Sequence, residues 1–251
     1  MSKFISKQSV ASWYAMTALL ATFLVGQVIL WFFPDGSSMG TSLLFILMNL
    51  IPLIVAAVFS LVLSEVNSLG EFFKKVFLQK ESSLSWILAF FIPVIYYGIS
   101  ILLMNVRFTG NSLLAFFIYF PWTLLYGGLE EVGWRWFLQD HLSYSKHFIP
   151  KMMLLSIVWF LWHIPIYQLP WITAGSSNYL IFYLMILGNA FLFGALKEYS
   201  KGAVPCILAH MLIDSLAVLM LVQSSLPQII LLVIFEILVA SWLVAARKSE
   251  K

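Results

Sequence analysis

The sequence has 251 residues, of which 62% are hydrophobic types and only 10% are Asp, Glu, Lys or Arg. Soluble domains average about 25% charged residues, so this chain lacks the side chains from which a water-facing surface is built. The composition excludes an ordinary soluble fold and predicts an all-α, polytopic transmembrane helical bundle, forming one membrane-embedded domain over residues 1–251. The net charge of +3 comes from scattered basic residues with no aromatic-flanked patch, so no nucleic-acid partner is expected.

A transmembrane helix needs roughly 20 mostly apolar residues, and eight stretches of the chain approach this length. They lie at about 12–33, 42–63, 84–105, 112–130, 152–168, 179–195, 203–222 and 227–246. The first is too long in its apolar region for a signal peptide, so we expect it to be retained. The longest connection, residues 64–83, is expected to form an interfacial amphipathic helix around Phe72, Phe73, Val76 and Phe77.

The basic residues are divided unevenly when the connections are assigned alternately to the two sides of the membrane. The side that holds the N-terminus receives twelve of them, and the other side receives only Arg107. The twelve are Lys3, Lys7, Lys74, Lys75, Lys80, Lys146, Lys151, Lys197, Lys201, Arg247, Lys248 and Lys251. Positively charged connections favour the cytoplasmic side. Both termini are therefore expected in the cytoplasm of a cell whose membrane the chain crosses several times.

Few ionisable side chains lie inside the apolar segments, and such residues are functional candidates because burying them in a membrane is costly. They are Glu130, Glu131, Arg135, His163, His210, Asp214 and Glu236. The alternative for each is an interhelical hydrogen bond that only holds the bundle together. Glu236 has no partner at motif spacing, and for it the structural role or a water contact is favoured.

The spacing of these residues indicates a common site. Glu131 and Arg135 are four residues apart, so on a helix they share a face and can pair. Glu130 then points about 100° away and is free for chemistry. His210 and Asp214 repeat the four-residue spacing.

The expected depth of these residues in the membrane supports the same grouping. At 1.5 Å per residue, Glu130 lies roughly 14 Å from the cytoplasmic end of its helix, His163 roughly 18 Å, and His210 and Asp214 roughly 10–17 Å. Three helices thus bring polar groups to about the same level. A buried Glu beside two His can activate water, with the oxyanion stabilised by a metal or by neighbouring donors.

Other catalytic arrangements are poorly supported. Cys206 lies four residues before His210, but a Cys–His pair would leave the two Glu and Arg135 without a role. No HExxH motif is present, so the zinc-binding helix of one large metalloprotease class is missing. His141 and His147 fall in a charged connection and are expected to be solvated.

The ordered motifs resemble those of the CPBP family of intramembrane proteases. Glu130-Glu131-x-x-x-Arg135 comes first, a helix ending in His163 follows, and His210-x-x-x-Asp214 is last. The family, also called Abi, comprises CAAX prenyl endopeptidases and bacteriocin-processing or immunity proteins. The motifs cover residues 130–214, inside an expected catalytic core at about 112–222, and the eight-span layout is similar over the whole chain.

The resemblance implies roles for the six residues. Glu130 is the general base, with His163 as its partner in activating water for peptide hydrolysis, and Glu131 and Arg135 support the site. His210 and Asp214 bind a metal or stabilise the oxyanion, so His163, His210 and Glu130 are candidate ligands of a zinc ion, with a metal-free Glu/His mechanism as the alternative. The cavity of the family opens to the cytoplasm.

Two positions depart from the family pattern. Trp159 replaces the Phe of the usual FxxxH motif, which we interpret as a conservative change in a wall residue. Asp214 replaces the Asn of the prenyl endopeptidases, which favours the bacterial branch and metal participation.

The expected function is an intramembrane endopeptidase acting on a membrane-bound or lipophilic peptide. One alternative is a catalytically inactive scaffold or bacteriocin self-immunity protein of the same fold, and another is a proton-coupled transporter. Against the transporter, no pair of interrupted helices occurs in corresponding halves. The substrate stays open among a prenylated C-terminal motif, a bacteriocin precursor, a peptide pheromone and a damaged membrane protein.

Overall fold

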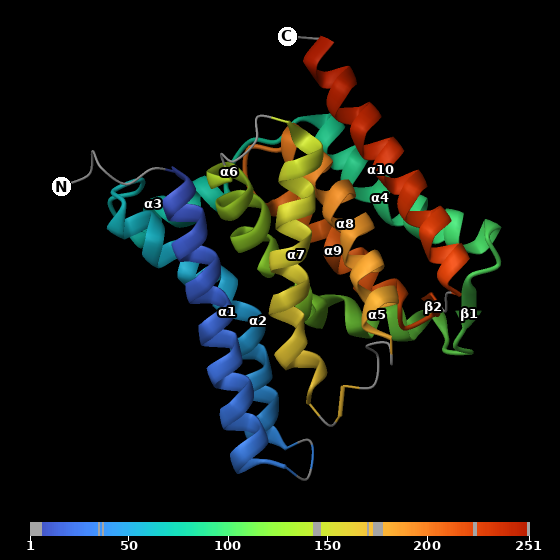
Figure 1. The fold of residues 1–251 in the computed structure, drawn as a ribbon, viewed down its shortest axis with the longest axis horizontal. Coiled ribbons are helices and arrows are strands. Elements are labelled where there is room, and N and C mark those ends of the chain that lie inside the picture. Colours follow the sequence, from blue (N-terminus) through green and yellow to red (C-terminus); the bar gives the residue numbers. More distant parts are fainter. Residues whose placement is uncertain are drawn as a thin grey trace.

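The computed structural model is a bundle of helices with one two-stranded sheet (Figure 1). It describes residues 7–249 except 35, 37, 143–146, 170, 173–177 and 223–224. In the first half of the chain the elements are α1 (Lys7–Phe32), α2 (Met39–Val62), α3 (Leu69–Phe77), α4 (Ser83–Leu102), β1 (Val106–Phe108) and α5 (Leu113–Thr123). Then follow η1 (Leu124–Gly128), η2 (Val132–Leu138), α6 (Gln139–His141), α7 (Phe148–Tyr167), α8 (Tyr179–Tyr199), α9 (Val204–Leu216), β2 (Met220–Val222) and α10 (Leu226–Ser249).

Within the described residues, six helices are long and apolar enough to cross a membrane, and α5–η1 with η2–α6 makes a seventh if the bent pair is one span. The multi-pass helical fold predicted from composition is therefore present. The expected span at 203–222 is instead the 13-residue helix α9, followed by β2. The count of eight spans stays a prediction, because α9 is shorter than the membrane core requires.

Serine residues begin several of the helices. The hydroxyls of Ser38, Ser68 and Ser82 accept hydrogen bonds from the first-turn amides of α2, α3 and α4. These caps satisfy N–H groups that have no partner within the helix. Each of these helices therefore begins at a defined residue. The helix predicted within 64–83 is present as α3, and its Phe72 and Val76 side chains are buried.

The two ends of the bundle differ in what they hold. The start of α1, the end of α10, α3 and α6 lie at one end, and the α1–α2 connection lies at the other (Figure 1). Strands β1 and β2 pair antiparallel, with Arg107 opposite Leu221. The start of α1 and the end of α10 are thus at the same end of the bundle (Figure 1). Which side of the membrane this is stays a prediction.

The helix carrying Glu130 is not straight, contrary to the sequence expectation. The segments Leu113–Gly128 and Val132–His141 are bent by 45° relative to each other. Both η1 and η2 are π-helical, and between them only Glu130 and Glu131 are α-helical. Adjacent glycines at the end of η1 remove the side chains that would oppose the wider turn, and π-helical turns often occur at functional sites.

Candidate active site

A cavity of about 620 Å³ lies inside the bundle between α2, α5, α7 and α9. Glu130, His163, His210 and Asp214 all line it. These residues come from three segments separated by at least thirty positions, and the depths expected from sequence predicted that they would meet. Aromatic and aliphatic side chains form much of the remaining wall, including Phe45, Tyr119, Tyr126, Tyr167 and Trp171.

Glu131 and Arg135 form the ion pair that their spacing predicts. The Arg135 Nε atom lies 2.8 Å from Glu131 Oε2, and both side chains are fully buried. The guanidinium also packs over the ring of Trp159 at 4.8 Å and donates to the carbonyl of Ala190 at 3.4 Å. Neither residue lines the cavity. Their placement supports the site from behind.

Glu130 is held by two indole groups. Its Oε2 accepts hydrogen bonds from Trp159 Nε1 at 3.1 Å and from Trp134 Nε1 at 3.3 Å. Among the described residues no hydrogen bond engages Oε1, and the side chain lines the cavity. Oε1 is therefore the oxygen that can meet a water or a substrate there.

His163 lies at the cavity with one ring nitrogen already engaged. Its Nδ1 is 2.8 Å from the backbone carbonyl of Trp159. A carbonyl oxygen only accepts hydrogen bonds, so Nδ1 carries the proton and the neutral ring has its lone pair on Nε2. The ring of Tyr167 stacks on the imidazole at 5.9 Å between centroids. Nε2 of His163 is thus a fixed proton acceptor.

His210 is placed between two carboxylates. Its Nδ1 lies 2.9 Å from Glu131 Oε1, and its Nε2 lies 3.5 Å from Asp214 Oδ2. The second distance is long for a hydrogen bond, so Nε2 is the less engaged nitrogen. Glu131 thereby links Arg135 to His210, which joins the first motif to the third.

Gly127 makes room for this third motif. A Cβ at Gly127 would collide with Asp214 Oδ2 and lie 3.0 Å from His210 Nε2. The glycine is required for close approach of η1 and α9.

The candidate metal site does not assemble. Among the described residues no group of three or more His, Cys, Asp or Glu is placed to hold a metal ion. His163 keeps Nε2 available, but both nitrogens of His210 face carboxylates. These side chains do not fit a three-ligand zinc site, so we derive no step through a metal. Metal use stays a prediction.

Two histidines and the cysteine have roles different from catalysis. His141 was expected to be solvated, but it is buried, with its ring nitrogens bonded to Phe137 O and Glu65 Oε1 at 2.8 Å each. A glutamate distant in sequence supplies its partner, which no local pattern indicates. His147 is exposed. Cys206 is fully buried and its thiol faces the carbonyl of Phe193, outside the cavity lining.

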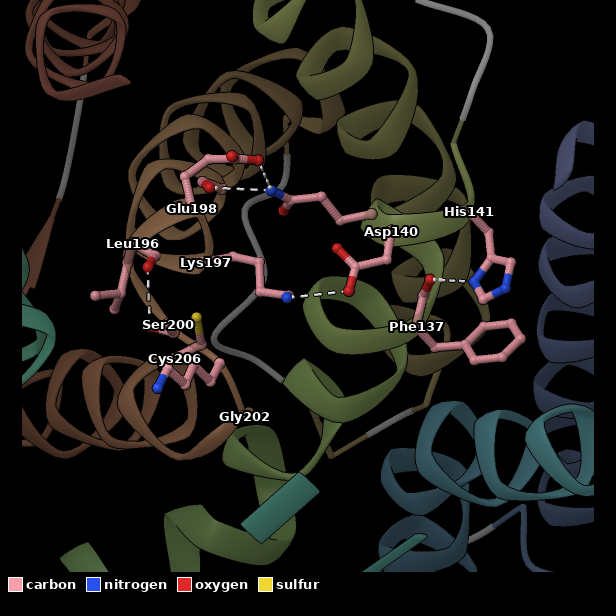
Figure 2. Close-up of polar contacts among 12 residues, drawn as sticks. Phe137, Asp140, His141, Leu196, Lys197, Glu198, Ser200, Gly202 and Cys206 are labelled. Carbon is pink, nitrogen blue, oxygen red and sulfur yellow. Dashed lines mark hydrogen bonds and ion pairs between the residues drawn. The ribbon is translucent and has the colours of Figure 1, made fainter. Parts of the chain in front are cut away.

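Polar contacts also anchor the far end of the segment that carries the two glutamates. Lys197 Nζ lies 3.0 Å from Asp140 Oδ2, and Gln139 Nε2 donates to Gly194 O and Glu198 Oε1 (Figure 2). These contacts join α6 to the last turns of α8. The bent segment therefore contacts α9 through η1 and α8 through α6, before and after the two glutamates.

Sequence reasoning missed two donors to Glu130. Trp159 was interpreted as a wall residue, and Trp134 was not considered. The signal for Trp134 was present, because it lies four residues after Glu130 and so on the same helix face. The contact from Trp159 depends on the packing of α7 against the bent segment.

The direction of the cavity bears on one expectation. Its lining runs from the four polar side chains to Ser42 near the start of α2, Tyr167 at the end of α7 and Leu221 in β2. These positions lie toward the end of the bundle opposite α3 and the start of α1 (Figure 1). Cytoplasmic termini and a cavity open to the cytoplasm both stay predictions, and the extent of the lining makes the entry side of the cavity a point to test.

The fold and the site define a multi-pass helical membrane protein with acidic and imidazole side chains gathered at one internal cavity. Residues 111–216 match the family profile of type II CAAX prenyl endopeptidase Rce1-like proteins. This match supports the CAAX protease (CPBP) family that the motifs predicted. The matched segment contains all six predicted site residues. No curated protein sequence matches the chain significantly.

Proposed function

We propose that the protein is an intramembrane endopeptidase that hydrolyses a peptide bond of a membrane-bound or lipophilic peptide. The observation that carries this proposal is the shared cavity, where Glu130, His163, His210 and Asp214 meet. The match to a family of CAAX-type endopeptidases supports the same reaction class. The cavity volume of about 620 Å³ is in the usual range for a ligand site.

Water activation falls to Glu130 and His163. Oε1 of Glu130 takes a proton from a water whose other hydrogen is held by Nε2 of His163. The water oxygen forms a bond to the scissile carbonyl carbon, the C–N bond then breaks, and Glu130 returns the proton to the leaving nitrogen. The two indole bonds hold Glu130 Oε2 away from the substrate and leave Oε1 for this exchange.

Stabilisation of the oxyanion falls to His210. Glu131 accepts a hydrogen bond from Nδ1–H of His210, so the Nε2–H donor exists only in the doubly protonated imidazolium form. In that form, the long contact to Asp214 leaves Nε2–H able to donate to the developing negative charge. Asp214 orients the ring. Arg135 in turn holds Glu131 in place.

For topology we propose cytoplasmic termini in the cell membrane of a bacterium, based on the chain's own basic residues. The cavity then opens away from the cytoplasm. The alternative is the cytoplasmic opening that the family resemblance implies.

The test compares membranes of cells that make the wild-type chain with those that make Glu130→Gln. Peptide mapping is expected to find at least one cleaved membrane peptide that disappears in the variant, with a loss of about 100-fold or more, as general-base removal typically causes. Full cellular function of Glu130→Gln would favour the scaffold or immunity alternative. Proton-coupled transport by purified protein in liposomes, without cleavage, would favour the transporter.

The metal question has its own measurement. Metal content of the purified protein is compared with that of His210→Ala. Stoichiometric zinc that is lost in the variant would require a rearranged site; protein that cleaves peptide without bound metal would support the residues alone.

A further inference from the structure

The starting observation is that Trp159 contacts four groups of the site. Its ring lies under the Arg135 guanidinium at 4.8 Å and against the His210 ring at 5.7 Å between centroids. Its backbone carbonyl accepts from His163, and its indole N–H donates to Glu130. A Phe, which the family usually has here, would keep the ring contacts and the carbonyl bond. The N–H donation alone would be lost.

Trp134 adds a second donor on the same carboxylate oxygen. Both indole N–H groups point at Glu130 Oε2, and both tryptophans are almost completely buried, at 2% and 0% exposure. Trp134 is fixed by edge contacts to Tyr14 and Trp162. The two donors are therefore held in position by packing and cannot follow a moving carboxylate.

We infer that Trp159 and Trp134 form an indole clamp that positions the Glu130 carboxylate for proton abstraction. A catalytic role of the clamp rests on the proposed function, whereas the two hydrogen bonds to Glu130 do not depend on it. A buried carboxylate without donors favours its neutral form, and hydrogen bonds to the charged form oppose this. Trp159 and Trp134 are thus positioning residues that act through Glu130.

Other titratable groups also face Glu130 and are unchanged by a Trp-to-Phe substitution. They are Tyr14, Glu131, His163, Tyr167, His210 and Asp214. Any change in the titration of Glu130 between the wild-type chain and the Phe variants therefore reports the lost N–H donors.

The test is an infrared titration of the purified protein in lipid nanodiscs. The band of the protonated Glu130 carboxyl is identified by its loss in Glu130→Gln, and its midpoint is measured for wild type, Trp159→Phe and Trp134→Phe. We expect Trp159→Phe to move the midpoint to higher pH by about one pH unit. Trp134→Phe, which loses the longer bond, is expected to move it less, and the double variant the most.

The matched control is Thr22→Val. The Trp162 indole N–H donates to Thr22 Oγ1 at 2.8 Å, and both side chains are fully buried. The control therefore loses a buried hydrogen bond that does not involve Glu130, while the Trp162 ring that packs on Trp134 is unchanged. It is expected to lower the melting temperature as much as Trp159→Phe without moving the midpoint.

The outcomes separate the clamp from the proposed function. An unchanged midpoint in both Trp159→Phe and Trp134→Phe, or an equal movement in Thr22→Val, overturns the clamp. If a cleaved peptide is identified, the acidic limb of kcat/KM must move in the same direction as the infrared midpoint. A shifted midpoint in a protein that cleaves nothing would retain the clamp and reject the endopeptidase.

Discussion

At the scale of single residues, the site depends on its polar side chains and on the lack of a side chain at Gly127. Gly127 lies where η1 passes closest to α9, and any Cβ there meets the carboxylate of Asp214. The adjacent Gly128 packs in the same way on Met211 and Ile207. Both glycines thus let η1 approach the helix that carries the third motif.

We predict that Gly127→Ala separates His210 and Asp214 from Glu130. A displacement of about 1 Å can cost roughly 100-fold in rate, and overpacking costs about 1–3 kcal/mol of stability. Peptide cleavage and thermal melting measure the two effects.

Gly98→Ala is the control for Gly127→Ala, since a Cβ at Gly98 in α4 meets nothing within 4 Å. This variant is expected to keep both activity and stability. Normal cleavage by Gly127→Ala would show that the approach of η1 to α9 is not needed.

At the scale of elements, a buried carboxyl group lies between two packed helices. Glu236 of α10 is fully buried, and neither of its oxygens has a hydrogen-bond partner among the described residues. Its carboxyl group sits where Gly188 of α8 has no side chain. The sequence favoured a hydrogen-bonding role for Glu236, but no described partner supports it. The contact between α8 and α10 is therefore a packing contact, in which the Glu236 carboxyl group fills the space left by Gly188.

This contact predicts non-additive stabilities. Gly188→Ala alone should destabilise the protein by about 1–3 kcal/mol, because the methyl group collides with the Glu236 carboxyl group. In Gly188→Ala with Glu236→Ala the collision is absent, so the double variant should be more stable than the sum of the single changes indicates. Thermal melting of all four proteins measures this coupling, and strict additivity would contradict the predicted contact.

At the scale of the whole molecule, α3 and the end of α10, which carry basic residues, lie at one end of the bundle, and the cavity lining extends toward the other (Figure 1). The basic residues bear on which end faces the cytoplasm, and the packing of the helices sets where the cavity leads. Only the two together indicate from which side a substrate would enter. The basic residues thus bear on the orientation of the chain in the membrane, and helix packing bears on the side from which the cavity is reached.

Cysteine labelling can decide this topology, because Cys206 is the only cysteine and is buried. In a Cys206→Ser background, Arg107→Cys should react with a membrane-impermeant maleimide in intact cells. Lys80→Cys should react only after the cells are permeabilised.

A third variant, Ser42→Cys, connects the labelling to the cavity that it lines. We expect it to follow Arg107→Cys, since both lie toward the same end of the bundle. Labelling of Ser42→Cys together with Lys80→Cys would contradict the proposed direction of the cavity, and the reverse pattern at all three positions would place the termini outside.

The sequence by itself determined the membrane class and most of the helices, and its motifs predicted the family and the six candidate residues. Those features depend on local quantities: apolar length, charge count and the four-residue spacing that pairs Glu131 with Arg135. Tertiary structure decided the 45° bend, the burial of His141 against Glu65, the indole donors to Glu130 and the direction of the cavity. These features require contacts between residues far apart in the chain, which helix packing creates and no local spacing encodes.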